Sequence, residues 1–379
     1  MTDPLRQDIA AAATTIVVKV GTRTLTRPDG SLDESRIEQL ATQLHLLMAT
    51  GRKVVLVSSG AVASGMGRLG LKERPRDLAK LQAVAAVGQS YLVQTYDRVF
   101  RSLGRQAAQV LLTTDDLDER ARYLNVRNTL LTLLEFGAVP IINENDTVST
   151  EELQTTFGDN DRLAAMVTNL IRAPLLVLLS DVLGLYDGDP SVEGSKLIST
   201  VIKIDESIYS LVRDKKTGLS KGGMASKLNA AKAATLSGEN VIITSGKDFS
   251  VLSRIAAGES IGTLFLAQGQ AITSWKRWIG FTAQPRGVLV LDEGARDAVE
   301  KKGKSLLAAG VVDVQGDFAK GDVVAVRNRA GFEFARGLTN YSAAEVLRIK
   351  GMKTEGIAAA LGHCPYQEVI HRDNMAVTV

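Results

Sequence analysis

The sequence predicts an α/β protein with a mostly parallel sheet sandwiched by helices, followed by a small β-barrel-like domain. Three observations lead to this prediction. Up to about Ala267, short apolar runs recur with little alternation, as is typical of strands buried on both faces. Amphipathic stretches that stop at glycine lie between them. After Pro285 the apolar runs are separated by frequent turn signals.

Six apolar runs are expected to form the buried strands of the first domain: 16–20, 54–57, 109–112, 139–142, 175–179 and 241–244. Helical spacing of apolar residues appears between them, from Arg36 to Gly51, over 123–136 before Gly137, and over 224–236 before Gly238. A repeated order of strand, helix, glycine and strand requires crossover connections. The sheet is therefore expected to be mostly parallel, with helices on both faces.

Four shorter strands are expected near the C-terminus, at 287–291, 311–314, 323–326 and 332–336. A helix is expected at 294–301. Another is expected to start at Ser342, whose spacing from Glu345 forms a capping box. We therefore expect a large domain at 1–274, a linker at 275–285 and the barrel-like domain at 286–379.

Charge and cysteine content narrow the class of protein. Lys and Arg number 45 against 42 Asp and Glu, a net charge of +3 over 379 residues, which argues against a protein that coats nucleic acid or an anionic membrane. Acidic and basic residues are also nearly equal in number after Pro285, so RNA binding by that region is unsupported. The single cysteine, Cys364, excludes an internal disulfide framework. Without a targeting segment or an apolar run long enough to cross a bilayer, the expected location is the cytoplasm.

Two glycine loops follow predicted strands of the large domain. Lys19 is followed by Val-Gly21-Thr, and Ser59 is followed by Gly60. The carboxyl ends of parallel strands form the ligand crevice of such a sheet, and glycine lets backbone N–H groups approach an anion closely. The alternative is that each glycine only permits a tight turn. Two such loops, one containing a lysine, favour a phosphate site.

The glycines at 65, 67 and 70 have the G-x-G-x-x-G spacing of a dinucleotide-binding loop. In that fold the first glycine follows the strand directly, whereas Gly65 lies well beyond the predicted strand 54–57. A nicotinamide site, and with it a dehydrogenase, is therefore not expected.

Two polar clusters, Asn-Glu-Asn-Asp at 143–146 and Gly-Asp-Asn-Asp at 158–161, follow the strand predicted at 139–142. Helix capping and turn formation explain part of this pattern, and binding of a hard ion such as Mg²⁺ is a third explanation. Lys227 lies in the first turn of a predicted helix that opens with two glycines. The helix dipole disfavours a lysine there unless a bound polyphosphate is present, although a solvated lysine remains the alternative.

The motifs at 19–22, 57–61, 142–146, 158–161, 180–181 and 222–227 stand in the order found in the amino acid kinase family, which this chain resembles. The C-terminal region resembles a PUA domain, and the two resemblances cover nearly the whole chain. They imply ATP-dependent phosphorylation of the γ-carboxylate of L-glutamate, the first step of proline biosynthesis. Mg²⁺ would be held mainly by the phosphates of ATP. An aspartate or N-acetylglutamate kinase is the nearest alternative.

The resemblance also implies roles for individual residues. Lys19, Lys227 and Asp161 would be catalytic, and Ser59, Asp146 and Asn160 would bind glutamate. The ATP site would be bordered by Lys19, Gly21, Gly60, Ser180, Asp181, Lys221, Gly222, Gly223, Met224, Ala225, Ser226 and Lys227. Lys221 departs from the family, which usually has threonine there.

Family members further imply a homo-oligomer that is inhibited by L-proline, and the segment 147–157 is the candidate inhibitor loop. A γ-glutamyl phosphate reductase is the expected next enzyme, because the acyl phosphate product is labile.

Overall fold

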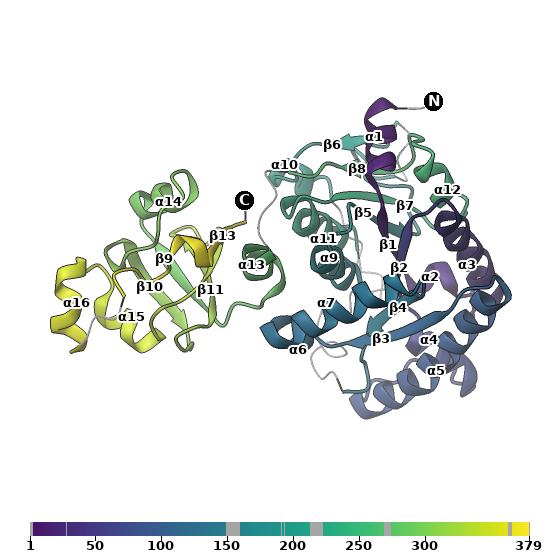
Figure 1. The fold of residues 1–379 in the computed structure, drawn as a ribbon, viewed down its shortest axis with the longest axis horizontal. Coiled ribbons are helices and arrows are strands. Elements are labelled where there is room, and N and C mark those ends of the chain that lie inside the picture. The colour runs from purple at the N-terminus through teal and green to yellow at the C-terminus, as the bar shows by residue number, and fades with distance from the viewer. Residues whose placement is uncertain are drawn as a thin grey trace. The chain divides into compact units, whose positions relative to one another are not determined.

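In the computed structural model, the residues described are 3–27, 29–148, 160–190, 192, 194–212, 223–268, 274–362 and 366–378. The chain divides into two compact units, Met1–Gln270 and Ala271–Val379. Figure 1 shows the elements of both units, each of which is described by itself. Among the described residues, no helix is both long and apolar enough to cross a bilayer.

The first unit is built on an eight-stranded sheet with the order β3-β4-β2-β1-β5-β7-β8-β6. Its strands are β1 (Thr15–Val20), β2 (Lys53–Ser58), β3 (Ala107–Leu112), β4 (Val139–Glu144), β5 (Leu175–Ser180), β6 (Thr200–Val201), β7 (Asn240–Ser245) and β8 (Thr263–Phe265). All neighbours pair in parallel except β7 and β8. The predicted mostly parallel sheet and its six strands are thus confirmed, but β3 lies at the edge of the sheet and only its last residue, Leu112, is buried, so the prediction that all six are buried is wrong for β3. The two short strands β6 and β8 were not predicted.

Helices cover both faces of this sheet (Figure 1). They are α1 (Pro4–Ala12), α2 (Thr22–Leu25), α3 (Glu34–Ala49), α4 (Ala61–Arg68), α5 (Leu78–Ser102), α6 (Thr114–Asp118), α7 (Arg120–Glu135), α9 (Asn160–Ile171), α10 (Glu206–Ser210), α11 (Met224–Leu236) and α12 (Val251–Ala256). Helices α7, α9 and α11 pack on one face, and α3, α5 and α12 pack on the other. The predicted sandwich is confirmed, and its helices end as expected at glycines with positive φ, such as Gly51, Gly137 and Gly238.

Strand β1 lies at the centre of the sheet, between β2 and β5. Its residues Ile16, Val18 and Val20 belong to the apolar core beneath α3, α5 and α12. Because side chains alternate along a strand, Lys19 points to the opposite face, on which α9 and α11 pack. The one charged side chain of β1 is therefore directed towards two helix N-termini.

Helices α4 and α5 cross with their backbones in direct contact. A Cβ atom on Gly65 would lie 1.9 Å from the Val84 carbonyl oxygen, and one on Gly88 would lie 1.8 Å from that of Ala61. Gly65 and Gly67 are thus interior residues of α4 rather than a strand-to-helix turn. Gly65 of the G-x-G-x-x-G pattern therefore serves helix packing here, since a side chain at this position would force the two helices apart.

The second unit contains a five-stranded sheet with the order β10-β9-β11-β12-β13. Its elements are α13 (Ser274–Arg277), the π-helical turn η1 (Trp278–Thr282), β9 (Gly287–Leu291), α14 (Glu293–Glu300), η2 (Ala308–Gly310), β10 (Val311–Gly316), β11 (Val323–Asn328), β12 (Glu333–Leu338), α15 (Ala343–Ile349), α16 (Thr354–Leu361), η3 (Arg372–Asn374) and β13 (Met375–Val377). Ser342 caps α15 through the predicted capping box with Glu345. Within the segment expected as a linker, η1 contacts β12 and β13 of this unit.

Candidate active site

The carboxyl ends of four neighbouring parallel strands, β4, β2, β1 and β5, meet at one edge of the large sheet. Ser59, directly after β2, donates its backbone N–H to Val20 at the end of β1 over 3.1 Å. Strand β1 is a topological switch point of the sheet. The strands that follow it first are added on the side of β2, and β5 is added on its other side. Ligands of open α/β sheets bind at such a point.

Two lysines from distant parts of the chain meet at one carboxylate here. Lys19 Nζ on β1 lies 2.5 Å from Oδ1 of Asp161, and Lys227 Nζ on α11 lies 2.8 Å from Oδ2. Asp161 lies in the first turn of α9 and is fully buried, while the two lysines are about 95% buried. The structure thus brings together the three residues predicted to be catalytic, and we call them the lysine bridge.

The lysine bridge keeps one net positive charge in a buried place, since it contains two ammonium groups and one carboxylate. Burial alone would raise the pKa of Asp161. The charges of Lys19 and Lys227 outweigh that effect and lower the pKa from 3.8 to about 2. Asp161 is therefore ionised at neutral pH, and the excess positive charge favours an anionic ligand.

Glycines line the approach to these ammonium groups. Gly21 caps α2, and a Cβ atom at this position would stand 3.8 Å from Lys19 Nζ. Gly60 caps α4 with φ of +110°, a conformation that other residues rarely adopt. Gly223 caps α11. Among the described residues, no side chain caps these three helices, and the N-terminus of a helix favours an anion.

A second group of polar side chains lies at the ends of β2 and β4. Asn160 donates through Nδ2 to Ser59 Oγ over 2.8 Å and to Asn143 Oδ1 over 2.9 Å. Asn143, near the end of β4, donates in turn to Gln89 Oε1 of α5 over 2.8 Å. Ser59 and Asn160, both predicted to bind glutamate, are thus joined directly. Asn143 and Gln89 were not among the predicted site residues.

The third predicted glutamate residue, Asp146, lies half-buried in the turn after β4. The remaining predictions in this region fall partly outside the described residues. Of the candidate inhibitor segment 147–157, the structure describes only Thr147 and Val148. Asp159 of the second polar cluster also lies outside the described residues.

The predicted nucleotide residues extend along the end of β5. Ser180 Oγ donates to Asp181 Oδ1 over 3.1 Å, and Arg23 pairs with Asp181 Oδ2 over 3.0 Å. Burial tends to raise the pKa of Asp181, but the hydrogen bond from Arg23 contributes to a net lowering. Arg23 was not among the predicted site residues.

On α11, the half-buried Met224, Ala225 and Ser226 form the turn between Gly223 and Lys227. Lys221 and Gly222 lie outside the described residues. Within the described ranges, no group of three or more His, Cys, Asp or Glu side chains is arranged to hold a metal ion.

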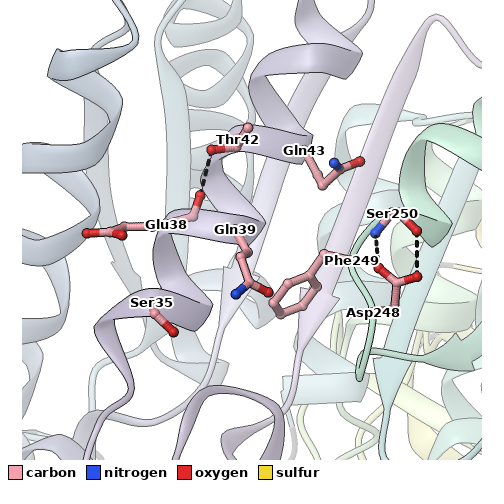
Figure 2. Close-up of a pocket in the computed structure, with 8 residues that line it drawn as sticks. All are labelled: Ser35, Glu38, Gln39, Thr42, Gln43, Asp248, Phe249 and Ser250. Carbon is pink, nitrogen blue, oxygen red and sulfur yellow. Dashed lines mark hydrogen bonds between the residues drawn. The ribbon is translucent and has the colours of Figure 1, made fainter.

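A separate pocket lies between α3 and the segment that precedes α12 (Figure 2). Its lining residues are Ser35, Glu38, Gln39, Thr42, Gln43, Asp248, Phe249 and Ser250. Several of its polar groups bond locally, as Ser250 does to Asp248. None of its lining residues is a predicted site residue, and α3 packs on the face of the sheet opposite Lys19.

Comparison with known proteins gives the family of this chain. Residues 14–245 match the amino acid kinase family. The chain belongs to the amino acid kinase family. Residues 287–361 match the PUA domain. The family and fold predicted from the sequence motifs are therefore confirmed.

Relatives of nearly the same length are similar over almost the whole chain. Proteins named glutamate 5-kinase from Rhodopirellula baltica, Caldanaerobacter subterraneus and Syntrophotalea carbinolica are 48%, 47% and 46% identical to it. These matches cover 99%, 96% and 98% of this chain and 96%, 97% and 100% of the respective relatives.

Proposed function

We propose that this protein transfers the γ-phosphoryl group of ATP to the γ-carboxylate of L-glutamate, as the first step of proline biosynthesis. The observation that carries the proposal is the lysine bridge, in which Lys19 and Lys227 share Asp161 at the crevice of the sheet. The choice of glutamate is supported by the name that the three relatives share.

The chemistry of the acceptor suits a site without a general base. A γ-carboxylate with a pKa of about 4.3 is already ionised at neutral pH and attacks the phosphorus atom directly. A carboxylate oxygen forms the new bond to phosphorus, the bond to the bridging oxygen of ATP breaks, and ADP leaves with the electron pair. The main obstacle is repulsion between an anionic nucleophile and an anionic phosphate.

The positive charge of the lysine bridge reduces this repulsion. In our proposal, the ammonium groups of Lys19 and Lys227 contact the transferring phosphoryl group, and N–H groups at Gly21 and Gly60 donate to it. Phosphoryl transfer depends mainly on positioning and charge stabilisation, which fixed buried cations provide. Asp161 holds both lysines in place through the contacts of 2.5 and 2.8 Å, and so acts as a positioning residue for them.

Glutamate is proposed to bind beside the bridge, against Ser59, Asn160 and Asp146. The first two are already hydrogen-bonded to each other. A carboxylate at Asp146 suits the α-ammonium group of a free amino acid. N-acetylglutamate lacks that charge and cannot make this contact with Asp146, so we expect it to be rejected.

ATP is proposed to lie along Ser180, Asp181 and the segment 221–227, with its phosphates directed at the glycine-capped helices. Mg²⁺ would be held mainly by the ATP phosphates, where it neutralises charge during transfer. We further propose inhibition by L-proline through the segment 147–157, a homo-oligomeric state, and delivery of the acyl phosphate to a γ-glutamyl phosphate reductase.

The test is ATP turnover with three candidate acceptors. L-glutamate, L-aspartate and N-acetyl-L-glutamate are each incubated with ATP, Mg²⁺ and hydroxylamine, which traps an acyl phosphate as a hydroxamate. Hydroxamate formation with glutamate alone supports the proposal, and its loss with EDTA supports the role of Mg²⁺. Equal or greater formation with another acceptor overturns the assignment to glutamate. Parallel reactions with L-proline test the proposed inhibition.

A further inference from the structure

Gln89 is a buried polar residue on a largely apolar helix face. It lies in the middle of α5, with a 7% exposed fraction, among buried neighbours that include Val84, Leu92 and Tyr96. A buried amide is costly unless it is hydrogen-bonded. The position of Gln89 therefore calls for an explanation beyond core packing.

Gly88, the residue before Gln89, allows α5 to approach the candidate active site. Gly88 lies so near the start of α4 that a Cβ atom would stand 1.8 Å from the carbonyl oxygen of Ala61. Ala61 follows Ser59 and Gly60, so this crossing places α5 directly against the glycine loop after β2. Gln89 then reaches Asn143 at the end of β4, over 2.8 Å.

The three amides form a chain with a defined direction. Asn160 Nδ2 lies 3.3 Å from the backbone oxygen of Ser58. In the flipped orientation of the amide, Oδ1 would face this oxygen and the two acceptors would repel each other. The Nδ2 group of Asn160 must therefore point towards Ser58, and Asn143 accepts from it through Oδ1. Asn143 then turns its own Nδ2 to Gln89, which accepts through Oε1. We call this arrangement the amide chain.

The amide chain leaves one acceptor unpaired beside the proposed glutamate residues. Oδ1 of Asn160 is buried and has no hydrogen-bond partner among the residues that the structure describes. Asn160 itself is 7% exposed and is bonded to Ser59 Oγ. An unpaired buried acceptor is suited to a ligand that donates a hydrogen bond. The α-ammonium group is the strong donor of glutamate at neutral pH.

We propose that Gln89 is a positioning residue for the amino acid substrate, acting through Asn143 to hold Asn160 with Oδ1 towards the α-ammonium group. This inference rests on the proposed function. Without Gln89, Nδ2 of Asn143 loses its acceptor, and the two asparagine amides can rotate. A rotated Asn160 presents N–H groups, which repel an ammonium group.

The experiment compares glutamate with glutarate, which has the same two carboxylates and lacks the ammonium group. In Gln89→Met, the apolar side chain keeps the length of glutamine and removes the acceptor. We expect the KM for glutamate to rise about tenfold, as loss of one hydrogen bond near a charged group predicts. The kcat, the KM for ATP and the turnover of glutarate are expected to stay close to wild type.

Two further variants separate positioning from general stability. Tyr96→Phe, on the same helix, removes the contact of Tyr96 OH with Ser58 Oγ, 3.1 Å away, but removes no hydrogen bond of the amide chain, which contacts the backbone oxygen of Ser58 instead. It is expected to leave the KM for glutamate unchanged. Gln89→Glu keeps an oxygen that accepts from Asn143, and is expected to restore much of the affinity lost in Gln89→Met.

The outcomes are distinct. Failure of wild-type protein to phosphorylate glutamate overturns the proposed function itself. If wild type is active, an unchanged glutamate KM in Gln89→Met overturns the positioning role, as does an equal loss with glutamate and glutarate. The same KM shift in Tyr96→Phe overturns it too. If Gln89→Met does not fold, Gln89→Ala, which removes the amide without adding volume, provides the same comparison.

Discussion

Replacing Asp161 with asparagine tests the centre of the candidate active site. The substitution keeps the shape of the side chain and removes the negative charge that faces Lys19 at 2.5 Å and Lys227 at 2.8 Å. Both lysines are about 95% buried, so water does not replace the missing charge easily. Asp161→Asn is therefore expected to destabilise the fold and to impair phosphoryl transfer.

The magnitude follows from the electrostatics of the bridge. Lowering the pKa of Asp161 from 3.8 to about 2 corresponds to about 2 kcal/mol in favour of the ionised carboxylate. Removing one partner of a buried ion pair costs more, about 3–5 kcal/mol, because a buried charge is left behind. We expect the free energy of unfolding to fall by about 3 kcal/mol or more at pH 7.

Urea unfolding of wild type and Asp161→Asn measures this difference, with Asp97→Asn as the matched control. Asp97 pairs with Arg101 on the surface of α5 over 2.9 Å, and such pairs contribute only about 0.3–0.5 kcal/mol. The kcat of Asp161→Asn is expected to fall about 100-fold or more, as when a transition-state contact is lost. Wild-type stability together with wild-type kcat would refute the reasoning.

The pH dependence gives a second measurement on the same variant. The pKa of Asp161 is lower in the folded protein, so its contribution to stability is present above the unfolded value of 3.8. That contribution is lost as the pH falls through the folded value of about 2. The stability gap between wild type and Asp161→Asn should therefore narrow over this acid range. A gap that is independent of pH would contradict the assigned charge state.

Three further predictions follow. Lys227→Ala is expected to lower kcat about 100–1,000-fold with little change in the glutamate KM, measured as ADP release; undiminished turnover would disprove a role in transfer. Asp146→Ala is expected to raise the glutamate KM strongly with a smaller loss of kcat, and an unchanged KM would rule out its contact with substrate. Asn169 is 1% exposed and, among the described residues, neither polar atom of its side chain has a hydrogen-bond partner. Asn169→Leu keeps the branching of the side chain and is expected to stabilise the fold by about 1–3 kcal/mol in urea unfolding, whereas a lower stability would show that the amide is satisfied.

Much of the fold was predictable because its signals are local. Apolar runs indicated six strands of the large sheet, and glycines such as Gly137 and Gly238 indicated helix ends. The short strands β6 and β8 carried no comparable signal, since a two- or three-residue strand is specified by its neighbours in the sheet. The same limit applies to Gly65, whose spacing resembled a nucleotide loop but whose role is contact with Val84.

The candidate site was only partly predictable. Lys19, Asp161 and Lys227 stood out because each follows or opens an element near glycines or acidic residues. Arg23 and Gln89 were missed, because each is an ordinary residue for a helix until its partner is known. The structure shows that Arg23 pairs with Asp181 and that Gln89 accepts a hydrogen bond from Asn143.

The sequence by itself determined the α/β class, the membership of a kinase family and the short motifs at the strand ends. Only the tertiary structure decided that Lys19 and Lys227 share the single carboxylate of Asp161, and that Gln89 continues a chain of amides to Asn160. The physical reason is the range of the interactions. Hydrophobic periodicity and helix capping act within one element, whereas charge pairing and close helix contact depend on which strands the sheet places side by side.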